Sequence, residues 1–364
     1  MVSVFKVLLL KREVIKMDYN FDELIEAARN DGCSDVHITV GTAMACRRYG
    51  SLDIIEDVPT AVQSKNLILE KLTDEQKKRV LSGKDLDFAI MMPNGTRLRA
   101  NIYHQRNNLA AAYRILNCEI PGYDELHIPN SVRNLVNETR GLILITGPTG
   151  SGKTSTMAAM VDYINANMKK HVITIEDPIE YVHYHKQSMI HQREIGTDVS
   201  DYATALYSSL REDPDVILVG EMRDYETIKA AITAAETGHL VFSTLHTSSA
   251  AQTVDRIIES YPPHGQNQVR IQLANVLKGV VTQALVPRED GKGMELATEV
   301  MINNEAVANL IREGKVHQIT STIESSGGLG MHTMDSDLKR LVREWKISKD
   351  EALKYCTNPK KFVL

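Results

Sequence analysis

The segment Gly141–Met157, GLILITGPTGSGKTSTM, combines a glycine-rich turn with a lysine and a threonine. Its centre fits the pattern G-x-x-x-x-G-K-[ST], in which backbone N–H groups converge on phosphate oxygens. In this pattern the lysine reaches the β- and γ-phosphates, and the threonine hydroxyl binds Mg²⁺. An apolar strand before the turn and a helix after it favour the same conclusion, because a helix N-terminus attracts anions. The sequence therefore predicts a site for ATP and magnesium.

The residues expected to hold the nucleotide are Gly147, Pro148, Thr149, Gly150, Ser151, Gly152, Lys153, Thr154 and Ser155, with Thr154 also on the metal.

Two later apolar runs end in carboxylates, which nucleotide hydrolysis needs to position water and support the metal. The run VITIEDPIEYVHYH carries Glu176, Asp177 and Glu180, and the run DVILVGEMRD leads into Glu221. The carboxyl ends of parallel strands meet at one edge of a sheet, where ligands bind. Glu221 is thus expected to support the metal through water, as a Walker B acid does. The alternative is that these acids only complement helix N-termini.

Histidines and arginines near these runs are candidates for contacts with phosphate. His239 and His246 lie at the two ends of the run HLVFSTLH, and we expect both to sense the γ-phosphate, although a lone histidine at a strand end is more often structural. Arg211 and Arg223 carry the charge needed to neutralise phosphate, although surface ion pairs would explain them equally well.

The elements that position these residues follow from the apolar patterns. From Val132 onward, the strand-like runs LILIT, HVITIED, DVILVG and HLVFSTLH alternate with helical stretches. This alternation predicts a parallel sheet covered by helices on both faces. From about Gln266 onward the pattern predicts mostly helix.

The preceding part of the chain predicts a smaller α/β module with an antiparallel sheet. We expect a helix over FDELIEAARNDG, a strand over SDVHITVG and a long helical stretch over Ala61–Ser82. Two strands joined at Asn94-Gly95 and a third over LAAAYRIL should follow. Arg97 and Arg114 belong to this module, so they would reach a nucleotide only across a domain or subunit boundary.

Length and composition indicate two domains, since 364 residues exceed one comfortable core. The aperiodic segment NCEIPGYDELHIP marks a linker. We therefore expect an N-terminal extension at residues 1–16, a first domain at 17–118, a linker at 119–131 and an ATPase domain at 132–364. The extension shows no signal-peptide cleavage site, which leaves a start at Met17 or a peripheral amphipathic segment.

Charge and cysteine content exclude several classes of protein. The formal net charge of -5 argues against a general nucleic-acid binder. The four cysteines form no C-x-x-C pair, which argues against a zinc ribbon or a disulfide framework and favours reduced cytosolic thiols. No apolar run approaches the roughly 20 residues that span a bilayer.

Several motifs resemble the Walker A, Asp box, Walker B and His box of secretion and type IV pilus ATPases. They are GPTGSGKT, TIEDPIEYVH, HQRE, LREDPDVILVGEMRD and TAAETGHLVFSTLHT. Within that superfamily the chain is most similar to the PilT retraction ATPases, from about Met17 to Leu341. The segment AVANLIREGK resembles the retraction motif AIRNLIRE, and differs from it at Val307 and at Ala308, where the family has arginine. GGLGMHTMD resembles the segment that follows, and the sequence shows no tetracysteine zinc insert.

This resemblance implies a hexameric ring whose subunits join a PAS-like α/β domain to a RecA-like P-loop motor domain. It implies Glu180 as the general base and Glu221 as the Walker B acid. It also implies that Arg97, Arg114 and Arg211 neutralise charge on the nucleotide.

The implied partners are an inner-membrane pilus platform protein and, indirectly, pilin, with no nucleic acid. The implied location is the cytoplasm, peripherally on the inner face of the cytoplasmic membrane. The alternatives to pilus retraction are a pilus assembly or type II secretion ATPase, or an accessory retraction subunit that hydrolyses ATP weakly.

Overall fold

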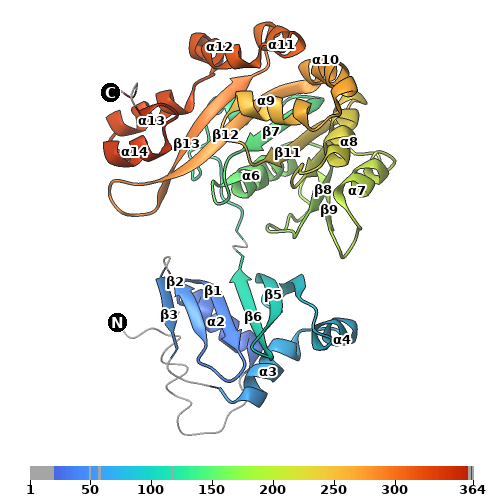
Figure 1. Cartoon of the computed structure of the whole chain (residues 1–364), viewed down its shortest axis with the longest axis vertical. Coiled ribbons are helices and arrows are strands. Elements are labelled where there is room, and N and C mark those ends of the chain that lie inside the picture. The colour runs from blue at the N-terminus through green and yellow to red at the C-terminus, as the bar shows by residue number, and fades with distance from the viewer. Residues whose placement is uncertain (1–19, 49–50, 56–58, 117–118, 360–361, 363–364) are drawn as a thin grey trace. The chain divides into compact units, whose positions relative to one another are not determined.

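The computed structural model describes residues 20–48, 51–55, 59–116, 119–359 and 362, and the chain divides into two compact units between Glu119 and Ile120. Each unit has its own sheet, coloured blue to teal in the first unit and green to orange in the second (Figure 1). The extension predicted at residues 1–16 lies outside the described residues.

The first unit contains a six-stranded antiparallel sheet in the order β3-β2-β1-β6-β5-β4, which confirms the predicted antiparallel module. Its strands are β1 (Cys33–Thr39), β2 (Ala45–Arg48), β3 (Ser51–Ile54), β4 (Leu86–Met91), β5 (Arg97–Gln105) and β6 (Asn108–Ile115). Its helices are α2 (Phe21–Asn30), α3 (Ala61–Glu70) and α4 (Asp74–Leu81). The ring of Phe21 meets that of Tyr113 edge-on at 4.9 Å inside the core.

The long helical stretch predicted over Ala61–Ser82 is wrong in one respect, because it is divided into α3 and α4. The second helix begins with a capping box, in which Thr73 and Gln76 each bind the backbone N–H of the other. The short strands β2 and β3 were also not predicted.

The second unit is built on a seven-stranded sheet in the order β13-β12-β7-β11-β10-β8-β9. All neighbouring strands pair in parallel except β12 and β13, which pair antiparallel. The strands are β7 (Gly141–Thr146), β8 (His171–Glu176), β9 (Met189–Glu194), β10 (Val216–Val219), β11 (Leu240–Leu245), β12 (Leu277–Pro287) and β13 (Met294–Ile302). Every residue of β7, β10 and β11 is buried, as expected of strands covered on both faces.

Helices cover both faces of this sheet, as predicted. One face packs against α5 (Asn130–Leu135) and α6 (Lys153–Asn167). The other face packs against α7 (Tyr202–Ser209), α8 (Tyr225–Glu236), α9 (Ala250–Glu259), α10 (Gln266–Val276), α11 (Glu305–Arg312) and α12 (Ile319–Ser325). A separate cluster joins α13 (Met334–Arg343) and α14 (Lys349–Tyr355) to β12 and β13.

The expectation of mostly helix from Gln266 onward holds for α10 to α14 but omits β12 and β13, which form a long hairpin there. The run LKGVVTQALVP is rich in β-branched residues, and Asp290-Gly291 in the connecting turn is a common hairpin dipeptide. The strand β9 was also missed. The hairpin matters for the candidate site because β12 lies directly beside β7.

Candidate functional site

The glycine-rich loop joins the end of β7 to the start of α6. Gly147, Gly150 and Gly152 have φ angles of 139°, 80° and 87°, which side-chain-bearing residues rarely adopt. A Cβ atom at Gly147 would lie 2.4 Å from the backbone oxygen of Gln283 on β12. The close approach of β12 therefore requires glycine at the first position of the loop.

Lys153 is the first residue of α6, and its side chain turns back toward the loop. Its Nζ donates to the backbone oxygens of Gly147, at 2.7 Å, and Pro148, at 2.9 Å. The residue is only 9% exposed, and this burial lowers the pKa of its ammonium while the charge of Glu221 opposes the change. Lys153 thus places a positive charge at the base of the loop, whose crest at residues 148–150 is exposed.

Glu221 and His246 follow β10 and β11, at the same edge of the sheet as the glycine loop. Leu245 pairs with Thr146, the last residue of β7, and the N–H of Met222 donates to the backbone oxygen of Thr244. His246 Nε2 lies 3.6 Å from Glu221 Oε2. These contacts bring a carboxylate and an imidazole together beside the loop.

The same Glu221 oxygen lies 2.6 Å from Nε of Arg223. This ion pair raises the pKa of Arg223. Arg223 is mostly exposed whereas Glu221 is largely buried, so the arginine covers the carboxylate from the solvent side.

His239 does not join this group, which corrects the expectation that both histidines sense the γ-phosphate. Its backbone oxygen accepts a hydrogen bond from the N–H of Gly141, the first residue of β7. Six residues of β11, each rising about 3.3 Å, therefore place His239 about 20 Å from the edge that carries His246. Its Nδ1 lies 3.1 Å from the backbone oxygen of Ala234, which indicates a structural role at the end of α8.

The three acids at and after the end of β8 lie in different surroundings. Glu176 Oε1 accepts hydrogen bonds from Thr174 Oγ1 at 2.6 Å and Gln192 Nε2 at 3.1 Å, so it is held within the sheet edge. Asp177 is exposed, and Glu180 is half-buried in the segment that follows.

Tyr181, next to Glu180, was missed in the sequence. Its hydroxyl lies 2.9 Å from Ser155 Oγ in the first turn of α6. This contact brings the segment that carries Glu180 to the helix end where the glycine loop closes. No sequence pattern indicated this contact, beyond the proximity of Tyr181 to the acidic run.

Gln283 on β12 was also missed, because the hairpin itself was not predicted. Its Nε2 donates to Thr156 Oγ1 on α6 at 2.8 Å, and its backbone oxygen packs against Gly147. Gln283 therefore contacts the first residue of the loop and the first turn of the helix that follows it.

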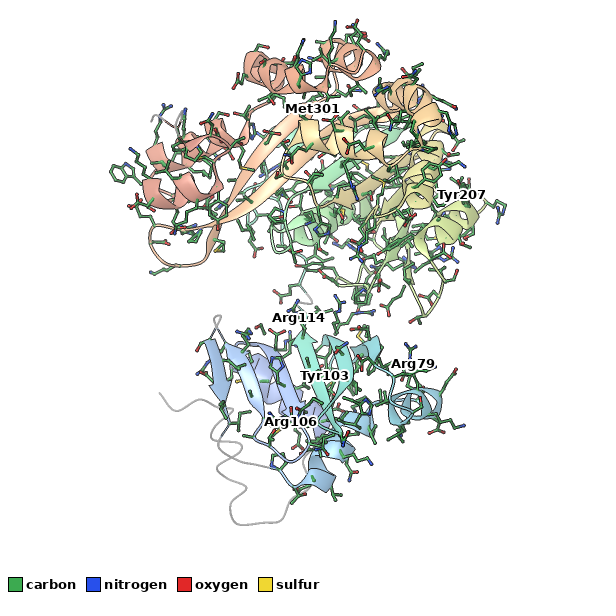
Figure 2. The ribbon with its side chains drawn as sticks, in the orientation of Figure 1. Arg79, Tyr103, Arg106, Arg114, Tyr207 and Met301 are labelled. Atoms are coloured by element: carbon green, nitrogen blue, oxygen red, sulfur yellow. The ribbon has the colours of Figure 1, made fainter. Side chains whose placement is uncertain are left out.

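The predicted arginines are distributed over both units. Arg211 is exposed just after α7, and its Nη1 lies 3.4 Å from the backbone oxygen of Tyr207. In the first unit, Arg97 is the first residue of β5. Arg114 lies near the end of β6 (Figure 2), and its Nε pairs with Asp35 Oδ1 at 3.0 Å.

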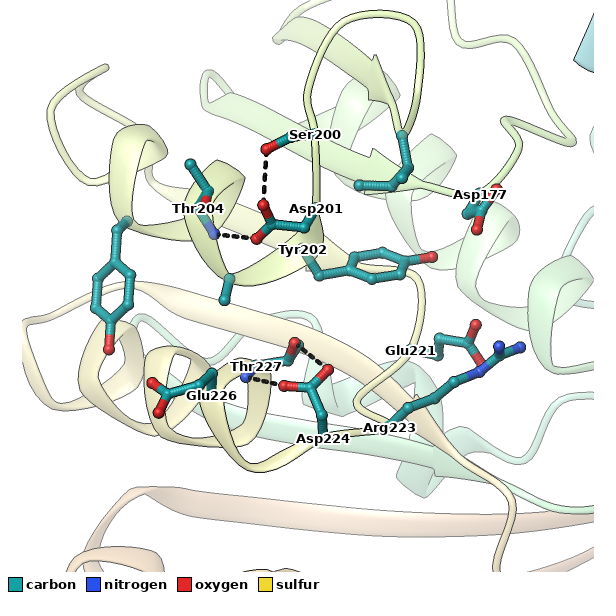
Figure 3. Close-up of a pocket in the computed structure, with 13 residues that line it drawn as sticks. Asp177, Ser200, Asp201, Tyr202, Thr204, Glu221, Arg223, Asp224, Glu226 and Thr227 are labelled. Atoms are coloured by element: carbon teal, nitrogen blue, oxygen red, sulfur yellow. Dashed lines mark hydrogen bonds and ion pairs between the residues drawn. The ribbon is translucent and has the colours of Figure 1, made fainter.

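A cavity of about 610 Å³ lies beside Glu221, between the residue that follows β8, α7 and the start of α8 (Figure 3). Among the described residues that line it, the carboxylates are those of Asp177, Asp201, Glu221, Asp224 and Glu226, and Arg223 is the one basic residue. Two of these acids have structural partners, since Asp201 accepts from the backbone N–H of Thr204 and Asp224 from that of Thr227. The cavity wall is therefore negative, with two of its charges used to cap α7 and α8.

The oxygen donors at the loop suit magnesium. Among the described residues, no group of three or more histidines, cysteines or acids forms a metal cage. Mg²⁺ prefers hard oxygen ligands and commonly binds through one or two side chains, substrate phosphates and water. The Thr154 hydroxyl in the first turn of α6 and the carboxylate of Glu221 provide such donors.

Comparison with known proteins yields matches over most of the chain. Residues 19–350 match the family model described as Type II/IV secretion system protein. The chain is 42% identical over 341 residues to the type IV pilus retractation ATPase PilT of Pseudomonas aeruginosa, covering 93% of this chain and 99% of that protein. It is 45% identical over 293 residues to a twitching motility protein of Neisseria gonorrhoeae, covering 80% of this chain and 78% of that protein.

A crystal structure of the pilus retraction motor PilT with bound ADP matches this fold with a TM-score of 0.89 at 42% identity. The match covers 94% of this chain and 98% of that chain. It confirms the predicted fold class, a RecA-like α/β motor domain preceded by a smaller PAS-like domain.

A parallel sheet with a glycine loop, a buried lysine and an acid at the neighbouring strand end defines a nucleotide-binding ATPase. The chain belongs to the type II/IV secretion system protein family, and within it to the PilT group of pilus retraction ATPases. In the part of the chain that the structure describes, none of the helices is both long enough and apolar enough to span a bilayer.

Proposed function

We propose that this chain is a hexameric ATP-hydrolysing motor that powers type IV pilus retraction by withdrawing pilin subunits. The observation that carries the proposal is 42% identity, over nearly the whole length of both proteins, to a protein named as a pilus retractation ATPase. A glycine loop with Lys153 and Thr154 in place, and Glu221 at the adjacent strand end, supports retained hydrolysis.

In the proposed reaction, ATP phosphates lie on the backbone N–H groups of Gly147–Thr154, and Lys153 contacts the β- and γ-phosphates. The negative phosphates favour the charged lysine, against the burial that lowers its pKa. Thr154 and, through water, Glu221 hold Mg²⁺, which neutralises charge on the phosphates. Glu180 takes the proton of the attacking water, and His246 contacts the γ-phosphate.

At the level of the assembly, Arg97, Arg114 and Arg211 are proposed to neutralise nucleotide charge within the ring. ATP binding closes the first domain over the motor domain, and hydrolysis allows it to reopen. Alternation of these states around the ring would act on an inner-membrane platform protein from the cytoplasmic side. Nucleic acid has no part in this cycle.

ATP hydrolysis by the purified chain tests the proposal. Glu221→Gln removes the metal-supporting charge but leaves the loop intact, so we expect nucleotide binding with a loss of turnover of about 100-fold or more. DNA and RNA should not stimulate the wild-type rate. Equal turnover in the wild type and Glu221→Gln would refute the assignment of Glu221, and an inactive wild type would refute the motor.

A further inference from the structure

Glu299 is a buried carboxylate with no role in the reaction proposed above. It lies on β13 and is 5% exposed. In the strand register it pairs with Thr282 of β12, which in turn pairs with Thr146, the residue before the glycine loop. The hydroxyls of Thr146 and Thr282 lie 2.9 Å apart. Glu299 therefore lies on a cross-strand row that leads directly to the nucleotide loop.

The two oxygens of Glu299 contact the first residues of two different helices. Oε1 accepts a hydrogen bond from the N–H of Ala250, at the start of α9, at 2.8 Å. Oε2 lies 3.5 Å from the N–H of Met334, at the start of α13. Burial raises the pKa of Glu299, while these two backbone N–H groups oppose that rise.

These contacts bind backbone N–H groups at the starts of α9 and α13 that the cap residues of the two helices leave without a partner. Ser249 caps α9 by accepting from the N–H of Gln252, and Thr333 caps α13 by accepting from that of Ser336. The first N–H of each helix has no partner within its helix, and Glu299 supplies one. Two positive helix ends also favour a negative charge at this position.

The contact with Ala250 fixes the end of the loop that carries His246. This loop is bound to the first turn of α9, since Thr247 Oγ1 lies 2.7 Å from Thr253 Oγ1 and Ser248 Oγ donates to Gln252 Oε1 at 2.7 Å. Glu299 connects that same turn to the sheet. Glu299, on β13 two strands away from β7, therefore holds the first residue of the helix to which the His246 loop is bound.

The start of α13 has further attachments to β13. The N–H of Thr298 donates to Asp337 Oδ2 at 2.8 Å, and the N–H of Val300 donates to the backbone oxygen of His332 at 2.9 Å. Removal of the Glu299 carboxylate should therefore leave α13 attached and the fold intact, while it releases the start of α9.

We propose that Glu299 is a positioning residue for ATP hydrolysis, which holds the His246 loop at the nucleotide edge and connects it to the start of α13. This inference rests on the proposed function, in which His246 contacts the γ-phosphate. Glu299 itself touches no nucleotide, so its effect is expected on turnover and not on ATP binding.

Steady-state kinetics of Glu299→Leu and Glu299→Gln test the proposal. Leucine removes both contacts at similar volume, and we expect kcat to fall about 10-fold or more with KM for ATP changed less than about twofold. Glutamine keeps one oxygen for the N–H of Ala250 and should retain most of kcat. Glu295→Gln is the matched control, because Glu295 is equally buried on β13 but pairs with His127 and Arg288.

Two further measurements separate positioning from a structural effect. In a His246→Ala background, Glu299→Leu should lower kcat no further. If Glu299→Leu lowered kcat by the same factor with and without His246, the proposal would be overturned. It would also be overturned if Glu299→Leu left the kcat of the otherwise wild-type protein unchanged. Amide hydrogen exchange at residues 246–251 should accelerate in Glu299→Leu and not in Glu295→Gln. Unchanged exchange in Glu299→Leu would overturn the positioning role, whether or not the wild type hydrolyses ATP. An inactive wild type would refute the proposed function instead.

Discussion

His246 and His239 flank one strand, yet the structure gives them opposite surroundings. His246 lies 3.6 Å from Glu221 at the nucleotide edge, whereas His239 contacts the end of α8 at the other edge. Their residue types and symmetric placement in the sequence did not distinguish them. The direction of β11 relative to β7 does, because parallel strands bring only their carboxyl ends to the loop.

This difference predicts different results for the same substitution at the two positions. His246→Gln should lower kcat for ATP hydrolysis about 10-fold or more, because it removes an imidazole from the proposed γ-phosphate contact. His239→Gln should leave kcat within about twofold of the wild type. Steady-state hydrolysis by both purified variants makes the comparison, and an equal loss in the two would contradict the placement of His239.

His183 is a buried residue whose titration should affect stability. Its side chain is 8% exposed, and burial, with a smaller effect of Lys186, lowers its pKa from 6.5 to about 4 against the opposing charge of Asp162. The unfolded chain therefore binds a proton at a higher pH than the folded chain does. The resulting stabilisation is present above about pH 6.5 and is lost as the pH falls toward 4.

We predict that His183 accounts for about 2 kcal/mol of the loss in unfolding free energy between pH 7 and pH 5. Urea unfolding of the wild type and His183→Leu at the two pH values measures this contribution. The variant should lose about 2 kcal/mol less than the wild type over this interval. Parallel pH dependence of the two proteins would show that His183 titrates normally in the folded state.

At the scale of elements, the sequence predicted the strand, loop and helix around Lys153 because each has a strong local signal. The apolar run, the glycines and the helical spacing are all within 17 residues, Gly141–Met157. The hairpin β12–β13 was missed because an apolar run such as that of β12 does not by itself distinguish strand from helix. Its turn dipeptide is a local signal, but the strand that places it in the sheet, β7, is distant in sequence. Gln283 and Glu299 were missed with it, since only the cross-strand register brings them to the loop.

The close packing of β12 on the loop predicts a position-specific effect of alanine. Gly147→Ala places a Cβ 2.4 Å from the Gln283 backbone oxygen and 2.6 Å from Ser151 Oγ, so the loop or β12 must move. Gly150 also has a positive φ, of 80° against 139° at Gly147, but no atom within 4 Å of an added Cβ, which makes Gly150→Ala the control.

We expect Gly147→Ala to weaken ATP binding by about 100-fold or more. Gly150→Ala should weaken it by about 10-fold or less, because the substitution mainly adds backbone strain of about 1 kcal/mol. Equilibrium titration with a fluorescent ATP analogue provides the measurement. Equal affinity of both variants would mean that contact with β12 does not shape the loop.

At the scale of the whole molecule, the departures from the retraction motif lie on the buried face of α11. Val307 and Ala308 belong to the core, whereas Asn309, Arg312 and Glu313, which match the motif, are exposed. The departures therefore alter packing beneath the helix and leave its exposed face as the motif has it. This arrangement supports retraction over an accessory role.

The direction of work on the pilus is the central claim, and surface pilus counts test it most directly. Cells that lack the gene should be compared with cells that carry Lys153→Ala, which removes the lysine expected to contact the phosphates. We predict more surface pili and a loss of twitching in both strains, because pili would still assemble without being withdrawn. Bald cells would show that the protein drives assembly, and an unchanged count would contradict a principal role in retraction.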